Sequence, residues 1–151
     1  MTHWLTAEEQ RLWRGWIAAS MLLPQRLNRD LQDLHGLTGT DYQILVELSE
    51  SPDRQVRMSV LADHVQLSRS RLSHQIDRMT KAGLVSRAEC EQDGRGMYAV
   101  LTDQGWEAIV AAAPDHVASV RRHLVDRLTP QEFEAFGNTC IKIADALRTD
   151  A

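Results

Sequence analysis

The start of one predicted helix carries residues with the chemistry needed to bind duplex DNA. Ser68 is a residue type that caps helix N-termini, and the first turn behind it reads Arg69-Ser70-Arg71. The free amides and the dipole of a helix N-terminus favour phosphate, and an arginine can bind both major-groove acceptors of guanine. Further along the same helix the polar side chains are Ser73, His74, Arg78 and Lys81. Together these side chains form a candidate surface for DNA.

This helix also has an apolar face, on which Leu72, Ile76 and Met79 recur at helical spacing. A short helix predicted over 60–65, with Ser59 as its cap, precedes it across a tight turn. A helix with one apolar and one basic, hydroxyl-bearing face fits the major groove while its back packs on a core, as in a helix-turn-helix. Any surface helix has a polar outer face, so an ordinary exposed helix is the alternative.

A β-hairpin is predicted over residues 84–102, where the apolar period changes from helical to alternating. An Asp-Gly pair that begins at Asp93 lies between the two runs, and the return strand covers 97–101. Arg95, at the tip of this projecting ribbon, could enter a minor groove through the negative potential there. Asp93 would hold the tip in shape by pairing with Arg95 or Arg87. The alternative is a solvated turn with an ordinary salt bridge.

Helices are predicted on both sides of this segment. Thr6 and Glu9 form a capping box at the start of the first helix, and Pro24 is expected to kink or break it. A second helical stretch ends at Gly36, and Thr40 is predicted to cap the helix after it. On the C-terminal side, two further helices are expected, with their caps at Thr102 and Thr129.

The fold class predicted from this order is mainly α (α+β), with a winged helix-turn-helix core and a two-stranded wing. We expect N-terminal dimerisation helices over 1–39, a DNA-binding lobe over 40–102 and C-terminal dimerisation helices over 103–151, as one intertwined domain. The flanking helices have more apolar residues than one small domain needs to cover itself. These residues are Leu12, Trp16, Leu128, Phe133, Phe136, Ile141, Ile143 and Leu147. A homodimer would fix two lobes about one helical turn of DNA apart, roughly 34–36 Å.

Several motifs in this sequence resemble the MarR family of bacterial transcriptional regulators. They are Leu61-Ala62, Leu67-Ser68-Arg69-Ser70, Leu72, Ile76-Asp77-Arg78-Met79, Gly83-Leu84-Val85, Arg87, Asp93-Gly94-Arg95 and Leu101-Thr102. The Asp-x-Arg of the wing, with the Leu-Thr at its exit, is the most specific of them. The resemblance covers nearly the whole chain and implies a homodimeric winged-helix repressor or activator. It also implies that residues 68–74 read the major groove and Arg95 the minor groove.

The function predicted from residues and resemblance is sequence-specific transcription regulation. The protein would be a homodimeric repressor that binds a palindromic operator in double-stranded DNA. The predicted DNA-binding residues are Ser68, Arg69, Ser70, Arg71, Ser73, His74, Arg78, Arg87, Asp93 and Arg95. The alternative is a winged-helix protein-interaction module that does not bind DNA. The charge pattern favours DNA weakly, because basic residues outnumber acidic ones eight to five over 54–95 whereas the whole chain has a net charge of −4.

The resemblance further implies that a small aromatic or phenolic effector releases the protein from DNA. The residues on elements that could line such a pocket are Trp13, Arg14, Trp16, His35 and Tyr42. Tryptophans at helical spacing are usually core residues, so no ligand-binding residue is assigned. Some related regulators sense peroxide through an N-terminal cysteine, but residues 1–39 contain none, and Cys140 is expected to be a small buried residue.

Other classes of function lack their signatures in this sequence. It has no Gly-rich phosphate loop, no Gly-x-Ser-x-Gly elbow and no pair of histidines at metal-binding spacing, so we expect no enzyme, no cofactor and no metal. With 43% apolar and 25% charged residues the chain can bury a core. It has no run of the roughly 18 apolar residues that a membrane span needs and no signal peptide, so we expect a cytoplasmic protein.

Overall fold

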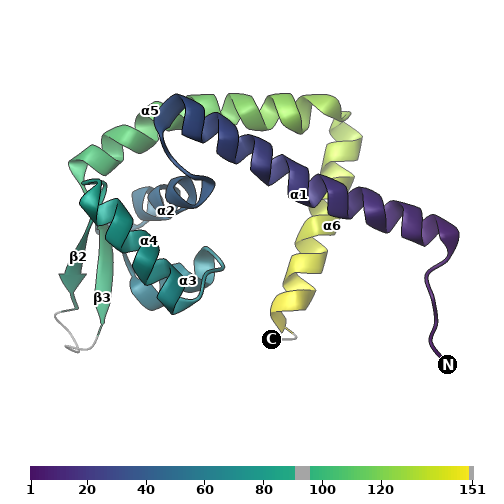
Figure 1. Ribbon diagram of the computed structural model, residues 1–151, viewed down its shortest axis with the longest axis horizontal. Helices are drawn as coiled ribbons and strands as arrows, with labels where there is room; N and C mark the ends of the chain where they lie inside the picture. Colours follow the sequence, from purple (N-terminus) through teal and green to yellow (C-terminus); the bar gives the residue numbers. More distant parts are fainter. Residues whose placement is uncertain (91–95, 150–151) are drawn as a thin grey trace. The chain divides into compact units, whose positions relative to one another are not determined.

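The computed structural model describes residues 1–90 and 96–149 of the chain, which divides into two units. Leu27–His116 form one unit, and Met1–Arg26 with Val117–Ala151 form the other. Two long helices, α1 (Ala7–His35) and α5 (Asp103–His123), contribute residues to both units (Figure 1). The second unit also contains the short 3-10 helix η2 (Val125–Arg127) and α6 (Pro130–Thr149).

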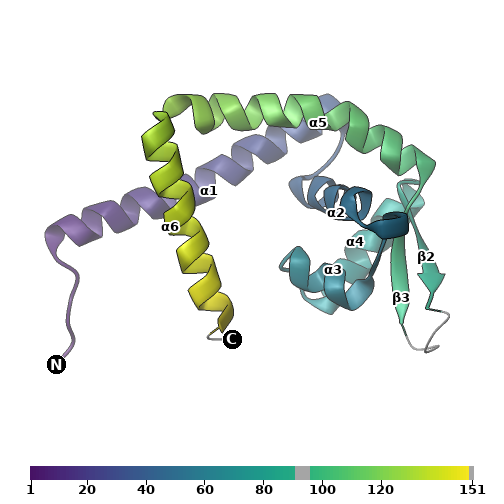
Figure 2. The same ribbon diagram turned by 180° about the vertical axis from the view of Figure 1, so that it is seen from behind.

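The unit over 27–116 is a winged helix-turn-helix, which confirms the predicted fold class. Its elements after α1 are α2 (Gly39–Glu50), η1 (Pro52–Arg54), β1 (Gln55–Arg57), α3 (Met58–His64), α4 (Arg69–Lys81), β2 (Val85–Glu89) and β3 (Met97–Leu101). The antiparallel sheet has the strand order β1-β3-β2. In both views, α2, α3 and α4 lie on one side of the β2–β3 hairpin (Figures 1 and 2).

The sheet extends the predicted two-stranded wing by a third strand, β1, which pairs with β3 through Val56 and Ala99. Only Val56 of its three residues is buried. A strand this short cannot show a period of two, because one buried residue between two polar ones is compatible with any turn. The sequence pattern therefore predicts no strand before the short helix expected over 60–65.

The core of this unit lies between the three helices and the sheet. The predicted apolar face of α4 is confirmed, because Leu72 and Ile76 are fully buried and Met79 almost so. Ile44 and Leu45 of α2 are also fully buried. Burial of one such side chain contributes about 1.5–3 kcal/mol, so these contacts determine which face of α4 remains outside.

The predicted break at Pro24 is wrong, because α1 continues through it from Ala7 to His35. A proline removes one backbone donor from the helix, while the turns on either side keep their backbone hydrogen bonds. The Ser20 hydroxyl adds a bond to the carbonyl of Ile17 at 2.9 Å in the turn before the proline. The N-terminal helices are therefore one helix, which ends before Gly36 at a φ of +66°.

Two predicted caps are also wrong. Thr38, not Thr40, caps α2: its hydroxyl accepts from the Asp41 amide at 3.0 Å, and the Asp41 carboxylate accepts from the Thr38 amide at 2.9 Å. Asp at the third helical position thus completes the capping box, where the sequence pattern favoured Glu or Gln. Ser59 lies inside α3, whose N-cap is Arg57 without a side-chain bond. The caps at Thr6, Ser68, Thr102 and Thr129 are confirmed.

Within the described residues, 1–90 and 96–149, no helix combines the length and the apolar character that crossing a bilayer requires.

The start of α5 packs directly against the chain that leaves α4. The Thr102 hydroxyl donates to the carbonyls of Gly83 and Leu84, at 2.6 and 3.0 Å, and accepts from the Gly105 amide at 3.0 Å. A Cβ at Gly105 would lie 2.0 Å from the Leu84 carbonyl oxygen. Only glycine allows this approach, because the neighbouring atom is backbone and cannot rotate away.

We expect Gly105→Ala to lower the free energy of unfolding by about 1–3 kcal/mol, the usual range for overpacking, as measured by urea denaturation. The control is Glu107→Ala, an exposed position on the same helix, which should change stability by less than about 0.5 kcal/mol. Equal stability of the two variants would contradict the close approach of α5 to Leu84.

Candidate nucleic-acid interface

The first turn of α4 faces solvent. Ser68 is its N-cap, and the Ser68 hydroxyl accepts from the Arg71 amide at 3.2 Å. Ser68, Arg69, Ser70 and Arg71 are all exposed. Because the opposite face of the helix packs on the core, the first-turn arginines stay in solvent. The structure thus places these four predicted residues together on one accessible helix end.

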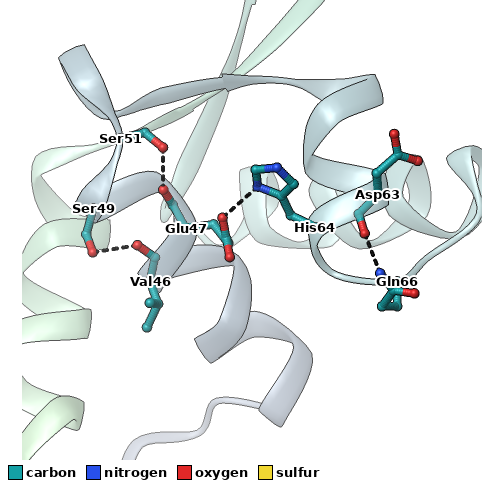
Figure 3. A network of polar contacts seen from close by, with 7 residues as sticks. All are labelled: Val46, Glu47, Ser49, Ser51, Asp63, His64 and Gln66. Atoms are coloured by element: carbon teal, nitrogen blue, oxygen red, sulfur yellow. Dashed lines mark hydrogen bonds and ion pairs between the residues drawn. The ribbon is translucent and has the colours of Figure 1, made fainter. Parts of the chain in front are cut away.

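The turn between α3 and α4 is attached to α2 by a polar contact. His64 Nδ1 lies 2.9 Å from the Glu47 carboxylate, and the side-chain amide of Gln66 donates from Nε2 to the Asp63 carbonyl at 2.7 Å (Figure 3). The Ser51 hydroxyl in turn donates to the Glu47 carbonyl at 2.7 Å (Figure 3). Gln66 has a φ of +56°, a left-handed conformation that closes the turn. These contacts join the end of α3 to α2 and close the turn that leads into α4.

The wing strand β2 is joined to α4 through Arg87. Its Nη2 donates to the Asp77 carboxylate at 2.8 Å, and to the carbonyl and hydroxyl oxygens of Ser73 at 3.1 Å each. Arg87 therefore supports α4 in addition to any contact with a ligand. The predicted pairing of Asp93 with Arg95 or Arg87 lies outside the described residues, as do both Asp93 and Arg95, and it stays a prediction.

The remaining predicted residues lie further along α4. His74 and Arg78 are exposed, and Ser73 is half-buried next to Arg87. The Arg78 guanidinium donates from Nη2 to the side-chain oxygen of Gln75, which is buried. The exposed face of α4 is thus continuous from its first turn to Arg78.

A hollow of about 440 Å³ lies between α3, α4 and the wing. Three of its lining residues are arginines, Arg57, Arg69 and Arg87, and Ser59 and Ser73 supply hydroxyl groups. Three guanidinium groups around one hollow favour an anion such as a backbone phosphate. The hollow is therefore a candidate anion site beside α4.

Sequence reasoning missed Arg57. This residue ends β1, and its Nη2 donates to the Cys90 sulfur at 2.9 Å, so it links β1 to the end of β2. Its guanidinium also lies 5.8 Å from the centre of the Tyr98 ring. In the sequence, Arg57 is distinguished only as a basic residue before a short helix. Its role becomes visible once β1 is paired with β3.

The structure shows the surroundings of the residues that could line an effector pocket. His35 Nε2 lies 2.8 Å from the Asp115 carboxylate, and Tyr42 packs on His116 with ring centroids 4.2 Å apart. Burial lowers the pKa of His116, and burial followed by the charge of Glu50 raises the pKa of Tyr42. In the other unit, Trp13, Arg14 and Trp16 are exposed, so the expectation that the tryptophans are core residues is wrong for the single chain.

Cys140 is half-buried and Cys90 is buried.

Comparison with known proteins identifies the family. The model of the MarR family matches residues 35–96. The structure of AbsC, a MarR family transcriptional regulator from Streptomyces coelicolor, has 49% sequence identity and a TM-score of 0.94, over 98% of this chain and 99% of that one. The chain belongs to the MarR family of transcriptional regulators.

Two further structures from Streptomyces coelicolor are similar. Sco3205, a MarR family regulator solved in complex with DNA, has 44% identity and a TM-score of 0.94, over 97% of this chain and 92% of that one. PcaV, solved with its natural ligand, has 22% identity and a TM-score of 0.73, over 97% and 99% of the two chains. The likeness to PcaV shows the shared fold.

The N-cap of α4 can be tested without any ligand. We expect Ser68→Ala to lower the free energy of unfolding by about 1 kcal/mol, because the Arg71 amide loses its acceptor. Ser70→Ala, an exposed change in the same turn, is the control and should leave stability unchanged or slightly higher. Chemical denaturation followed by circular dichroism measures both. If the two variants unfold alike, Ser68 does not cap α4.

Proposed function

We propose that this protein is a sequence-specific DNA-binding regulator that inserts α4 into the major groove. The observation that carries the proposal is the orientation of α4, whose apolar face is buried while its serine- and arginine-bearing first turn is exposed. The basic hollow beside it supplies a place for backbone phosphate. Sco3205, which is 44% identical, was solved with DNA, and this supports the same partner for this chain.

The side chains divide between two roles in this proposal. Arg69, Arg71 and the hydroxyls of Ser70 and Ser73 contact base edges and phosphates near the helix N-terminus, and His74 and Arg78 contact the next positions along it. Arg87 supports α4 and contributes charge to the hollow. Arg95 enters the minor groove and Asp93 shapes the tip, as the sequence pattern of the wing suggests.

In this proposal, the protein binds DNA as a homodimer. One face of α6 carries large apolar residues at helical spacing, all of them exposed: Phe133, Phe136, Ile143 and Leu147. Trp16 of α1 contacts Phe136 with ring centroids 6.3 Å apart, yet both remain about 40% exposed, at 44% and 37%. An exposed apolar surface of this kind is typical of a protein interface, and a second copy fits it because a palindromic operator needs two lobes.

The flanking helices over 1–39 and 103–151 are thus proposed as dimerisation elements, and 40–102 as the DNA-binding lobe. A repressor of this design, working in the cytoplasm, would be released from its operator by a small aromatic or phenolic effector. Support for the effector comes from the family resemblance. A panel of aromatic carboxylates added to the protein–DNA complex would identify a compound that dissociates it.

DNA binding is tested by fluorescence anisotropy with the duplex upstream of the protein's own gene, over a series of salt concentrations. We expect Arg69→Ala to weaken binding by about 1–3 kcal/mol if it contacts a base, or to reduce the salt slope by about one if it contacts phosphate. Arg148→Ala, which removes a cation from the end of α6, is the control and should change neither quantity.

A second variant separates DNA binding from folding. Ser68→Asp retains an N-cap acceptor for the Arg71 amide, so stability should be kept. The added carboxylate would face phosphate, and binding should fall. A protein-interaction module, the alternative function, would show no binding that follows the salt dependence of phosphate neutralisation.

The dimer is tested by light scattering at micromolar concentration. We expect a mass of twice the 17.1 kDa of one chain, and a shift toward monomer for Ile143→Glu, which places a charge in the apolar face of α6. Lys142→Glu, on the opposite side of the same helix, is the matched control and should leave the dimer intact. A monomeric wild-type protein would overturn the homodimer.

A further inference from the structure

The recognition helix α4 buries one polar side chain among its apolar residues. Gln75 is only 5% exposed and lies on the face that also carries Leu72, Ile76 and Met79. Taking a side-chain amide out of water is unfavourable unless its donor and its acceptor both find partners. An apolar residue would fill the same space without this requirement, so the contacts of Gln75 need a separate explanation.

Both ends of the Gln75 amide are hydrogen-bonded, each to a charged group. The amide nitrogen donates to Asp41 Oδ1, and the amide oxygen accepts from Arg78 Nη2. The orientation of the amide is therefore fixed, because rotating it by 180° would turn its oxygen toward a carboxylate and its nitrogen toward a guanidinium. Gln75 connects the half-buried carboxylate of Asp41 with the exposed guanidinium of Arg78.

Asp41 itself cannot move freely. Its second oxygen, Oδ2, accepts from the Thr38 amide at 2.9 Å, and its own amide donates to the Thr38 hydroxyl at 3.0 Å. The start of α2 is also bound to α1, where the Asn28 side-chain oxygen accepts from the Gly39 amide at 2.8 Å. A chain of hydrogen bonds therefore runs from the capping box of α2, through Asp41 and Gln75, to the exposed guanidinium of Arg78.

We propose that Gln75 is a positioning residue for DNA recognition, which sets α4 against the start of α2 and holds the Arg78 guanidinium in place for the DNA backbone. The inference rests on the proposed function. An arginine side chain loses much rotamer freedom on binding, and a side chain that is already held loses less of it. Gln75 uses one of the five N–H donors of the guanidinium, and the others can serve the phosphate.

The test separates this role from simple core packing. Gln75→Met keeps the volume and removes both hydrogen bonds. We expect it to weaken binding to the same duplex by about tenfold, because the released Arg78 side chain then loses more rotamer freedom on binding. In an Arg78→Ala background, Gln75→Met should have almost no further effect. A packing role would instead give the same loss of affinity in both backgrounds, and this result would overturn the proposal.

A pair of substitutions distinguishes a loss of DNA binding from a loss of stability. Gln75→Glu keeps an acceptor for Arg78 but places a second carboxylate against Asp41, so it should weaken DNA binding and lower the melting temperature. Adding Asp41→Asn supplies an amide that can donate to the new carboxylate while its oxygen still accepts from the Thr38 amide. We expect the double variant to recover both affinity and melting temperature. No recovery of affinity in a double variant that melts like wild type would overturn the proposal.

The wild-type protein supplies the remaining distinction. Failure of the wild type to bind any duplex would overturn the proposed function and this inference with it. Normal wild-type binding, combined with unchanged affinity for Gln75→Met, would leave the proposed function standing and refute the role of Gln75 alone.

Discussion

Burial of the apolar face of α4 is the constraint on which the rest of the lobe depends. Leu72 and Ile76 have no exposed surface, and removing either from the core would cost about 2–5 kcal/mol. A rotation of α4 about its axis would expose them, so the helix has one stable orientation. That orientation leaves the first turn, with Arg69 and Arg71, in solvent. The surface available to a ligand is thus a consequence of what the opposite face buries.

Hydrophobic burial is not directional, so it does not set the position of α4 to the accuracy that groove recognition needs. Directional contacts fix the position of α4 on three sides. His64 and Glu47 hold the turn before the helix, Arg87 joins the wing to Ser73 and Asp77, and Gln75 joins the helix to the capping box of α2. The contacts of Arg87 with Ser73 and of Gln75 with Asp41 are partly buried, where hydrogen bonds are strengthened, whereas the His64–Glu47 and Arg87–Asp77 contacts are exposed to solvent. Together these contacts attach α4, which carries the arginines, to α2 and to the wing.

Local patterns predicted the features that local physics determines. The apolar spacing of Leu72, Ile76 and Met79, the cap at Ser68 and the hairpin after Gly83 each depend on residues close in sequence, and the structure has all of them. The strand β1 and the partner of Gln75 depend on neighbours far along the chain. The continuity of α1 through Pro24 depends instead on the hydrogen bonds of its adjacent turns, which outweigh the one donor that the proline removes. Asp41 and Gln75 are 34 positions apart, and no periodicity announces such a pair. The contacts of the predicted site with DNA remain predictions.

In the proposed function, α4 enters the major groove as half of a symmetric pair. Chemical protection of guanine N7 by the bound protein tests it most directly, because this atom is exposed only in the major groove. We predict two protected clusters on the operator, separated by about one helical turn, 10–10.5 base pairs. Bound DNA whose guanine N7 atoms stay fully reactive, or are protected in one cluster only, would rule out this mode of binding.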